Sequence, residues 1–259
     1  TMIFTFIGAI VIGVSLGLLG SGGSILTVPL LTYIVERPPK VAIAESLLIV
    51  GGIALVGVWR QQQAGQVAWQ KVASFGLPSM VGTYFGALLS QYLSGLAQLV
   101  LFAVIMLLAS RFMLKPISVK ASDGVSLAKL IPAALVVGVI AGLVGVGGGF
   151  LIVPALLALG GVSMREAVGT SLAIIVLQSV VGFGKYFYLF SQQGALPFDF
   201  QLIALMVGIG AAGSLLGTKL GGHLPQQQLK KGFGVMLVVM GSFIFLSSLY
   251  AMHFVEVPV

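Results

Sequence analysis

The chain has 259 residues, of which 58% are hydrophobic and 7% are charged, and its mean hydropathy is +1.14. Soluble proteins have roughly a quarter charged residues, so this composition excludes a soluble domain and indicates a polytopic membrane protein. The excess of 13 Lys and Arg over 6 Asp and Glu lies between apolar runs, where it sets topology rather than binding nucleic acid, and the absence of cysteine excludes disulfides and thiolate metal sites.

Apolar runs and their breakers predict the same helical pattern twice, in repeat one (1–114) and in repeat two (130–259). Repeat one is expected to contain a glycine-broken hairpin at 3–35 and helices at 41–59, 72–92 and 96–114. A hydrophilic linker at 115–129 joins the repeats. Repeat two is expected to contain a hairpin at 130–159 and helices at 167–190, 200–220 and 233–252.

The two halves are a sequence duplication. Residues 13–50 align without a gap with 138–175, and about 15 of the 38 aligned positions are identical. Gly20 matches Gly145 and Pro29 matches Pro154 in this alignment. The offset between the halves then changes from 125 to 131, because repeat two has about six extra residues around 191–197.

Two topologies are compatible with the broken segments. If each one crosses the membrane once, the halves are parallel and the basic residues divide about 6 against 7, which gives no orientation. If each is a re-entrant hairpin, the halves are inverted and the division is 10 against 3. The positive-inside rule favours this all-α inverted-repeat fold, with the linker in the cytoplasm and both termini outside. The ten basic residues on the cytoplasmic side are then Arg60, Lys71, Arg111, Lys115, Lys120, Lys129, Arg165, Lys219, Lys230 and Lys231.

The glycine breaks are the first candidate substrate site. Glycine permits a tight turn within the membrane and lets a substrate approach the backbone amides. Glycine-interrupted segments at matching positions of two halves are typical of the substrate site of a secondary transporter, and two helix N-termini converging there would bind an anion. Close helix packing is the alternative, and a dinucleotide-binding fingerprint in 142–149 lacks its βαβ context. The candidate residues are Ser21, Gly22, Gly23, Ser24, Val146, Gly147, Gly148 and Gly149.

Polar residues in the helix after each hairpin form the second part of the candidate site. Ser46, Thr170 and Ser171 carry hydroxyl groups that would line the same cavity, unless they bond the carbonyls of their own helices. Gln178 could donate to an oxyanion or bridge two helices.

Glu45 occupies the position of repeat one that Thr170 occupies in repeat two. A carboxylate within the membrane is costly and is therefore a functional hypothesis, in this chain a proton-coupling group. The alternative is an interfacial carboxylate paired with Lys40 or Arg37.

The chain lacks the residue patterns of an enzyme. No paired carboxylates, histidine cluster or Ser/His arrangement lies at membrane depth in the sequence, so we expect no catalytic residues, no bound metal and no cofactor.

The paired motifs resemble a known family. GLLGSGGSILTVPLL and GLVGVGGGFLIVPALL are each followed about 15 residues later by a Ser-Leu, in AESL and in GTSL. These motifs are similar to those of the TauE/SafE sulfite exporter family of membrane permeases, and the resemblance spans essentially the whole chain. Glu45 departs from the threonine of the second copy, and an acid beside an anion site would repel the substrate unless it were protonated.

The resemblance implies transport of a small sulfur-containing anion, such as sulfite, thiosulfate, sulfate or an organosulfonate, across the cytoplasmic membrane of a prokaryote. We therefore expect a multi-pass permease that works by alternating access. Its partners would be a small anionic substrate, the lipid bilayer and, if Glu45 titrates, protons as the coupling ion. The alternatives are a passive anion channel, a carrier of another small solute and a membrane assembly factor without transport activity.

Overall fold

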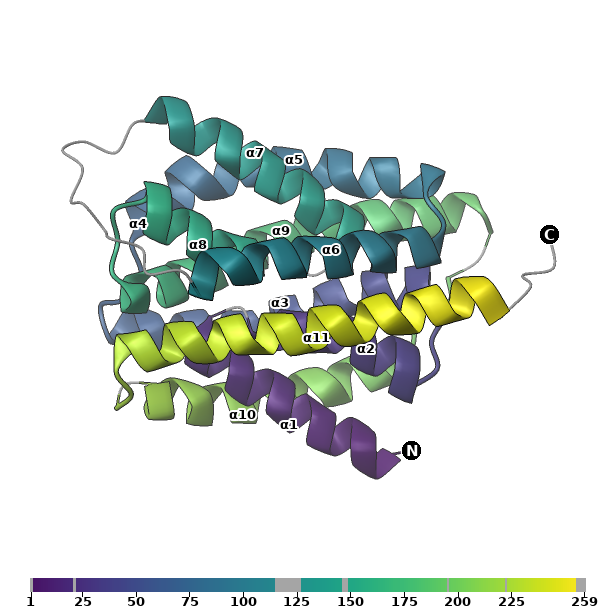
Figure 1. Ribbon diagram of the computed structural model, residues 1–259, viewed down its shortest axis with the longest axis horizontal. Coiled ribbons are helices and arrows are strands. Elements are labelled where there is room, and N and C mark those ends of the chain that lie inside the picture. Colours follow the sequence, from purple (N-terminus) through teal and green to yellow (C-terminus); the bar gives the residue numbers. More distant parts are fainter. Residues whose placement is uncertain are drawn as a thin grey trace.

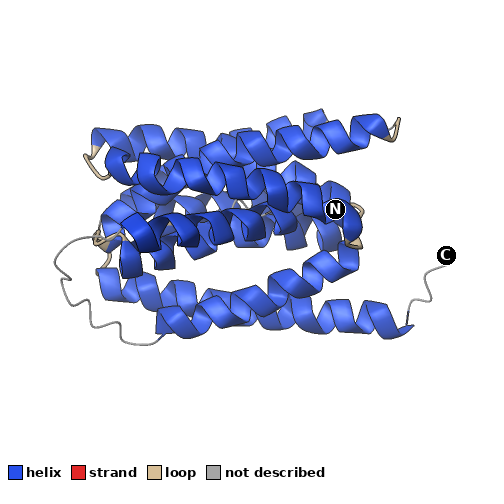
Figure 2. Ribbon diagram, turned by 90° about the horizontal axis from the view of Figure 1, so that it is seen from above, coloured by secondary structure: helices blue, strands red, loops and turns tan. Residues whose placement is uncertain are grey.

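The computed structural model describes residues 2–20, 22–114, 127–145, 149–194, 196–221 and 223–254. Within these ranges all regular structure is helical, and no residue lies in a strand (Figure 2). The helices run roughly along one direction and form an elongated bundle (Figure 1). The all-helical fold expected from composition is confirmed.

Repeat one contains six α-helices. Four of them are α1 (Met2–Leu19), α2 (Gly22–Pro29), α3 (Pro39–Gln63) and α6 (Gly95–Leu114), and a π-helical turn at Leu30–Ile34 extends α2. The remaining two, α4 (Trp69–Lys71) and α5 (Leu77–Leu89), are joined by a π-helical turn at Val72–Gly76, so that together they form one long segment.

Repeat two contains five helices, α7 (Leu127–Val144), α8 (Gly149–Leu159), α9 (Met164–Gln192), α10 (Phe200–Gly221) and α11 (Gln226–Phe254). The helix expected at 233–252 therefore begins earlier, at Gln226, and most of the linker, residues 115–126, lies outside the described ranges. A capping box begins α9, because Ser163 accepts from the Glu166 amide and the Glu166 carboxylate accepts from the Ser163 amide.

Five described helical segments are long and apolar enough to cross a membrane: Pro39–Gln63, Trp69–Tyr92, Met164–Gln192, Phe200–Gly221 and Lys231–Ala251. Five shorter apolar segments accompany them: Phe4–Leu19, Gly23–Ile34, Gly95–Arg111, Ala128–Val144 and Gly149–Leu159. Four of the shorter segments belong to the two glycine-broken regions. At 1.5 Å per residue, the shortest of these segments spans well under the roughly 30 Å hydrocarbon core.

Each glycine-broken region is a helical hairpin. The first helix of each region ends at a glycine in the left-handed conformation, with a φ of 72° at both Gly20 and Gly145. In the first hairpin, Gly8 lies against Leu30 and Gly23 lies against Ile12, so α2 runs back along α1. The second hairpin, formed by α7 and α8, enters the bundle from the opposite end (Figure 1).

We call the two ends of the bundle the terminal end and the linker end. The terminal end is where α1 begins and α11 ends, and the linker end is where α6 ends and α7 begins (Figure 1). Most of the basic residues belong to helix termini at the linker end. In the described ranges these are Arg60, Lys71, Arg111, Lys129, Arg165, Lys219, Lys230 and Lys231.

The hairpin of each half packs against a helix of the other half, and glycines lie at these contacts. Helix α1 packs along α10, where Gly13 meets Gly210, and α7 packs in the same way along α5, where Gly138 meets Ser79. These two contacts are equivalent under the sequence alignment. A β-carbon at Gly13 or Gly138 would overlap the partner backbone, so these small residues allow the helices to approach closely.

The equivalent helices α3 and α9 pair with each other at the centre. Leu47 contacts Gly182, Gly51 contacts Ser179 and Gly57 contacts Leu172, so the residue numbers rise on one helix as they fall on the other. The two helices are therefore antiparallel.

The packing role of the glycines can be tested on α10 with one substitution at two positions. At Gly213 a β-carbon would press on backbone atoms of Ile10 and Val14, whereas at Gly208 it would meet nothing within 4 Å. We expect Gly213→Leu to destabilise the purified protein by about 1–3 kcal/mol or more, because α1 and α10 are packed too closely to make room for the new side chain. The control, Gly208→Leu, should melt like the parent protein. Equal melting temperatures for the two variants would contradict this packing.

Candidate functional site

Two equivalent serines hold the hairpin turns. The Ser46 hydroxyl on α3 lies 2.5 Å from the carbonyl oxygen of Gly145 and can donate to it. The Ser171 hydroxyl on α9 lies 3.1 Å from the carbonyl oxygen of Gly20. Both hydroxyls also reach a carbonyl of their own helix, and both serines are fully buried. Each half thus supplies a donor to the turn of the other half's hairpin.

The structure does not bring the two turns together. The first turn contacts Ser171 and the second contacts Ser46, which lie near the starts of the antiparallel helices α9 and α3. Ser46 is at the level of Gly182, because the adjacent Leu47 contacts it. Eleven residues of α9 separate Ser171 from Gly182, which corresponds to about 16 Å along the helix axis. Gly20 and Gly145, the described residues beside the two turns, therefore lie at different levels along the bundle.

Several predicted turn residues lie outside the described ranges: Ser21, Val146, Gly147 and Gly148. The others begin the second helix of each hairpin. Gly22, Gly23 and Ser24 form the first turn of α2, and Gly149 is the first residue of α8. Gly23 packs against Ile12 and Leu16.

Thr170 and Glu45 bind loops of the opposite half. The Thr170 hydroxyl accepts a hydrogen bond of 3.0 Å from the Ala68 amide, and the Glu45 carboxylate accepts one of 2.9 Å from the Asp199 amide. Ala68 and Asp199 are themselves equivalent in the alignment. The threonine and the glutamate therefore perform the same anchoring contact at opposite ends of the bundle.

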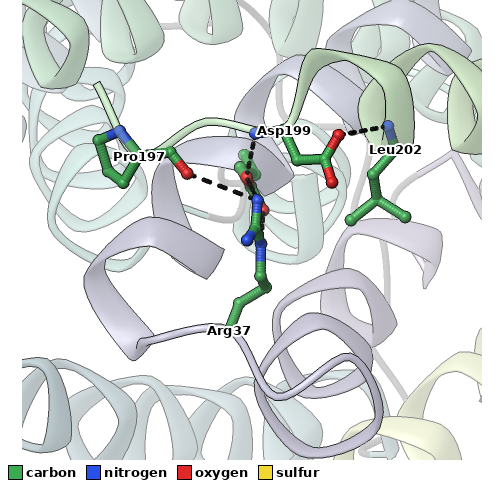
Figure 3. Close-up of polar contacts among 5 residues, drawn as sticks. Arg37, Pro197, Asp199 and Leu202 are labelled. Atoms are coloured by element: carbon green, nitrogen blue, oxygen red, sulfur yellow. Dashed lines mark hydrogen bonds and ion pairs between the residues drawn. The ribbon is translucent and has the colours of Figure 1, made fainter. Parts of the chain in front are cut away.

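Glu45 also forms an ion pair with Arg37 (Figure 3). Arg37 donates from Nη2 to Glu45 Oε1 at 2.5 Å and from Nε to Oε2 at 3.1 Å. Its Nη2 also reaches the Pro197 carbonyl at 3.5 Å. The hydrogen bond to Glu45 raises the pKa of Arg37, which lies in the loop before α3. Both carboxylate oxygens of the fully buried Glu45 thus have partners, and the pair joins this loop to the start of α10.

Gln178 is fully buried on α9, and neither its amide oxygen nor its amide nitrogen has a hydrogen-bond partner. The hydroxyls of Ser179 and Ser214 are likewise buried without partners. An unpaired buried polar group costs about 1–3 kcal/mol, so each of these groups is a candidate position for a ligand or a water molecule.

Sequence reasoning missed a basic cleft at the linker end. The cleft has a volume of about 350 Å³ and contains the cationic residues Arg60, Arg165 and Lys219. Its lining includes no acidic residue among those that the structure describes. Gly17 and Leu18, directly before the first turn, line it as well. Three cationic residues around one cleft create a positive potential that draws in anions.

The buried Gln61 side chain extends the cleft toward the interior. Gln61 is 4% exposed, and its amide oxygen has no partner. One sequence signal bears on the cleft, because the positive-inside rule assigns Arg60, Arg165 and Lys219 to the same side of the membrane. This signal predicts the topology but not that the three residues share a cleft.

Comparison with known proteins is consistent with this membrane architecture. Three relatives share 27–29% identity with the chain, and each is described as a probable membrane transporter protein. The Xylella fastidiosa strain Temecula1 protein is 29% identical over 90% of both chains. The Methanocaldococcus jannaschii protein is 27% identical over 92% of this chain and 94% of its own. The Haemophilus influenzae protein is 29% identical over 94% of this chain and 99% of its own.

No solved structure matches the chain. The family model described as "Sulfite exporter TauE/SafE" matches residues 5–244, which is nearly the whole sequence. This match confirms the resemblance that the duplicated glycine motifs indicated. The chain therefore belongs to the TauE/SafE sulfite exporter family.

Proposed function

We propose that this protein is a secondary transporter that moves a small sulfur-containing oxyanion, such as sulfite, thiosulfate or an organosulfonate, across the cytoplasmic membrane by alternating access. The observation that carries the proposal is the cleft of about 350 Å³, which contains three cationic residues and ends at the first hairpin. The family's name and the relatives' descriptions support the same function.

The chemistry of the cleft suits a small oxyanion. Two of its cations are arginines, whose planar guanidinium groups can donate paired hydrogen bonds to two oxygens of one anion. Lys219 adds a third positive charge from the last turn of α10. A sulfite or thiosulfate ion carries two or more terminal oxygens and occupies a small part of the cleft volume.

Unpaired polar groups mark a route from the cleft into the bundle. Gln61 lies at the cleft, and Gly57, one turn deeper on α3, contacts Ser214. Gly51, which contacts Ser179, lies ten residues from Gln61, or about 15 Å deeper. We place the deeper substrate site at this level, where the unpaired amide of Gln178 can donate to an oxyanion.

An inverted repeat would explain how the site reaches both sides of the membrane. The antiparallel pairing of the equivalent helices α3 and α9 supports such an arrangement, as does the entry of the two hairpins from opposite ends (Figure 1). The basic residues gathered at the linker end put that end in the cytoplasm by the positive-inside rule. The cleft would then open to the cytoplasm.

Anion binding in the cleft is the first test. The double variant Arg60→Gln/Lys219→Gln should bind sulfite at least ten-fold more weakly than the parent, because two of the three cleft cations are removed. Isothermal titration of the purified protein measures the affinity. Lys129→Gln is the control, since this exposed residue at the same end does not line the cleft. Unchanged sulfite affinity in the double variant would exclude the cleft as the anion site.

The topology can be tested with single cysteines, because the chain has none of its own. Gln70→Cys at the linker end should react with an impermeant thiol reagent only from the cytoplasm. Gln201→Cys at the terminal end, which is the repeat counterpart of Gln70, should react only from outside. Both side chains are exposed. Labelling of both cysteines from the same side would contradict the inverted repeat.

Glu45 distinguishes an anchoring ion pair from a proton-coupling group. Because both carboxylate oxygens have partners, we expect Glu45→Gln to lower stability by about 1.5–3 kcal/mol and to leave the pH dependence of transport unchanged. Arg37→Gln, which removes the same pair, should lower stability in the same way. Transport into proteoliposomes at several pH values is the measurement. A flattened pH profile for Glu45→Gln alone would instead assign the coupling proton to Glu45.

A further inference from the structure

The terminal end contains the repeat counterparts of the residues that line the basic cleft. The sequence alignment relates Gly17 and Leu18 to Gly142 and Leu143. Two of the three cleft cations also have basic counterparts, because Arg60 corresponds to Lys185 and Arg165 corresponds to Lys40, whereas Lys219 corresponds to Leu88. Gln61 corresponds to Tyr186.

Tyr186 fills this counterpart of the cleft. Its hydroxyl donates to the Gly142 carbonyl at 3.0 Å and lies 3.3 Å from the Leu143 carbonyl. These two residues are the counterparts of the two that are open to the cleft at the other end. Tyr186 is 2% exposed, so its ring occupies the space beside the end of α7.

Gln98 holds Tyr186 in this position. Its amide nitrogen donates to the Leu143 carbonyl at 2.6 Å and lies 3.2 Å from the Tyr186 hydroxyl, to which it can also donate. The counterpart of Gln98 in repeat two is Leu229, whose side chain has no hydrogen-bond donor. Only one of the two ends therefore has the residues for this hydrogen-bonded closure.

Lys185 directly precedes Tyr186 on α9. Its ammonium group lies 4.9 Å from the ring centre of Tyr84 and 5.0 Å from that of Tyr188, which are cation–π contacts. In the part of the chain that the structure describes, Lys185 has no ion pair with a carboxylate. Its charge is therefore available to an anion once the space beside it opens.

We propose that the terminal end holds a second, masked anion vestibule, which Tyr186 plugs and Gln98 latches, and which accepts the same small oxyanion as the basic cleft through Lys40 and Lys185. The inference rests on the proposed function, because a carrier that works by alternating access needs an entrance at each end. The structure is then the state that is open at the linker end and closed at the terminal end.

Thiol labelling of the purified protein tests the plug without any substrate. Ser90→Cys is the reporter, since Ser90 is 2% exposed and is the counterpart of Gly221, which lines the open cleft. Thr218→Cys reports on the open cleft itself. A charged methanethiosulfonate reagent should modify Thr218→Cys readily and Ser90→Cys at least ten-fold more slowly.

Tyr186→Gln, which introduces the residue found at the equivalent position of repeat one, should raise the labelling rate of Ser90→Cys at least ten-fold. The matched control is Ser191→Gln, five residues further along the same helix and exposed, which should leave the rate unchanged. If Tyr186→Gln does not fold, Gln98→Leu replaces the amide with an apolar side chain of similar size and removes the latch, so it should raise the rate instead.

A folded Tyr186→Gln protein whose Ser90→Cys stays protected would overturn the proposal. Equal labelling of Ser90→Cys and Thr218→Cys in the otherwise unchanged protein would do the same. A different result would contradict the proposed function, namely equal sulfite affinities of the parent protein and the Arg60→Gln/Lys219→Gln variant. The two proposals can therefore fail separately.

Discussion

The fold depends on satisfying the backbone groups that a broken helix leaves unpaired inside a membrane. A hydrocarbon environment offers no water to these groups, so each turn needs a donor or an acceptor from the protein. Ser46 and Ser171 meet this need, since each provides a hydroxyl to the turn carbonyl of the opposite hairpin. The requirement explains why each hairpin packs against the other half and why glycine occurs where the helices cross. The position of the basic cleft follows from this packing of hairpins against the opposite half, because the cleft ends beside the first hairpin.

The two halves have kept this framework and diverged in the side chains around it. Glu45 and Thr170 make the same loop contact, but only the glutamate adds an ion pair to it. Gln61 and Tyr186 occupy equivalent positions, and one lines an open cleft while the other fills its counterpart. A carrier that must open at one end while it is closed at the other needs two structurally similar halves whose closing contacts differ in strength. In the proposed carrier, the divergent pairs would supply that difference.

Much of the fold could be predicted from the sequence because its signals are local. Glycine breaks, apolar run lengths and the repeat alignment place the helices, and the alignment also identifies Ser46 and Ser171 as equivalent positions. The exchange of hairpins between halves was not predictable, since it depends on which glycine faces fit together, as Gly13 does with Gly210. The same limit applies to the site. The cleft is assembled from four separate helices, and a linear pattern does not reveal that Arg60, Arg165 and Lys219 share one space.

The exchanged serine contacts have a consequence for the origin of the fold. A single repeat folded alone would have a turn carbonyl with no hydroxyl to pair with it and a serine with no turn to bind. Two copies of one repeat could supply these contacts to each other only if their central helices lay antiparallel, as α3 and α9 do. A one-repeat ancestor of this chain would therefore have had to insert into the membrane in both orientations and to act as a dimer. Fusion of two such genes would have freed each copy to specialise for one side.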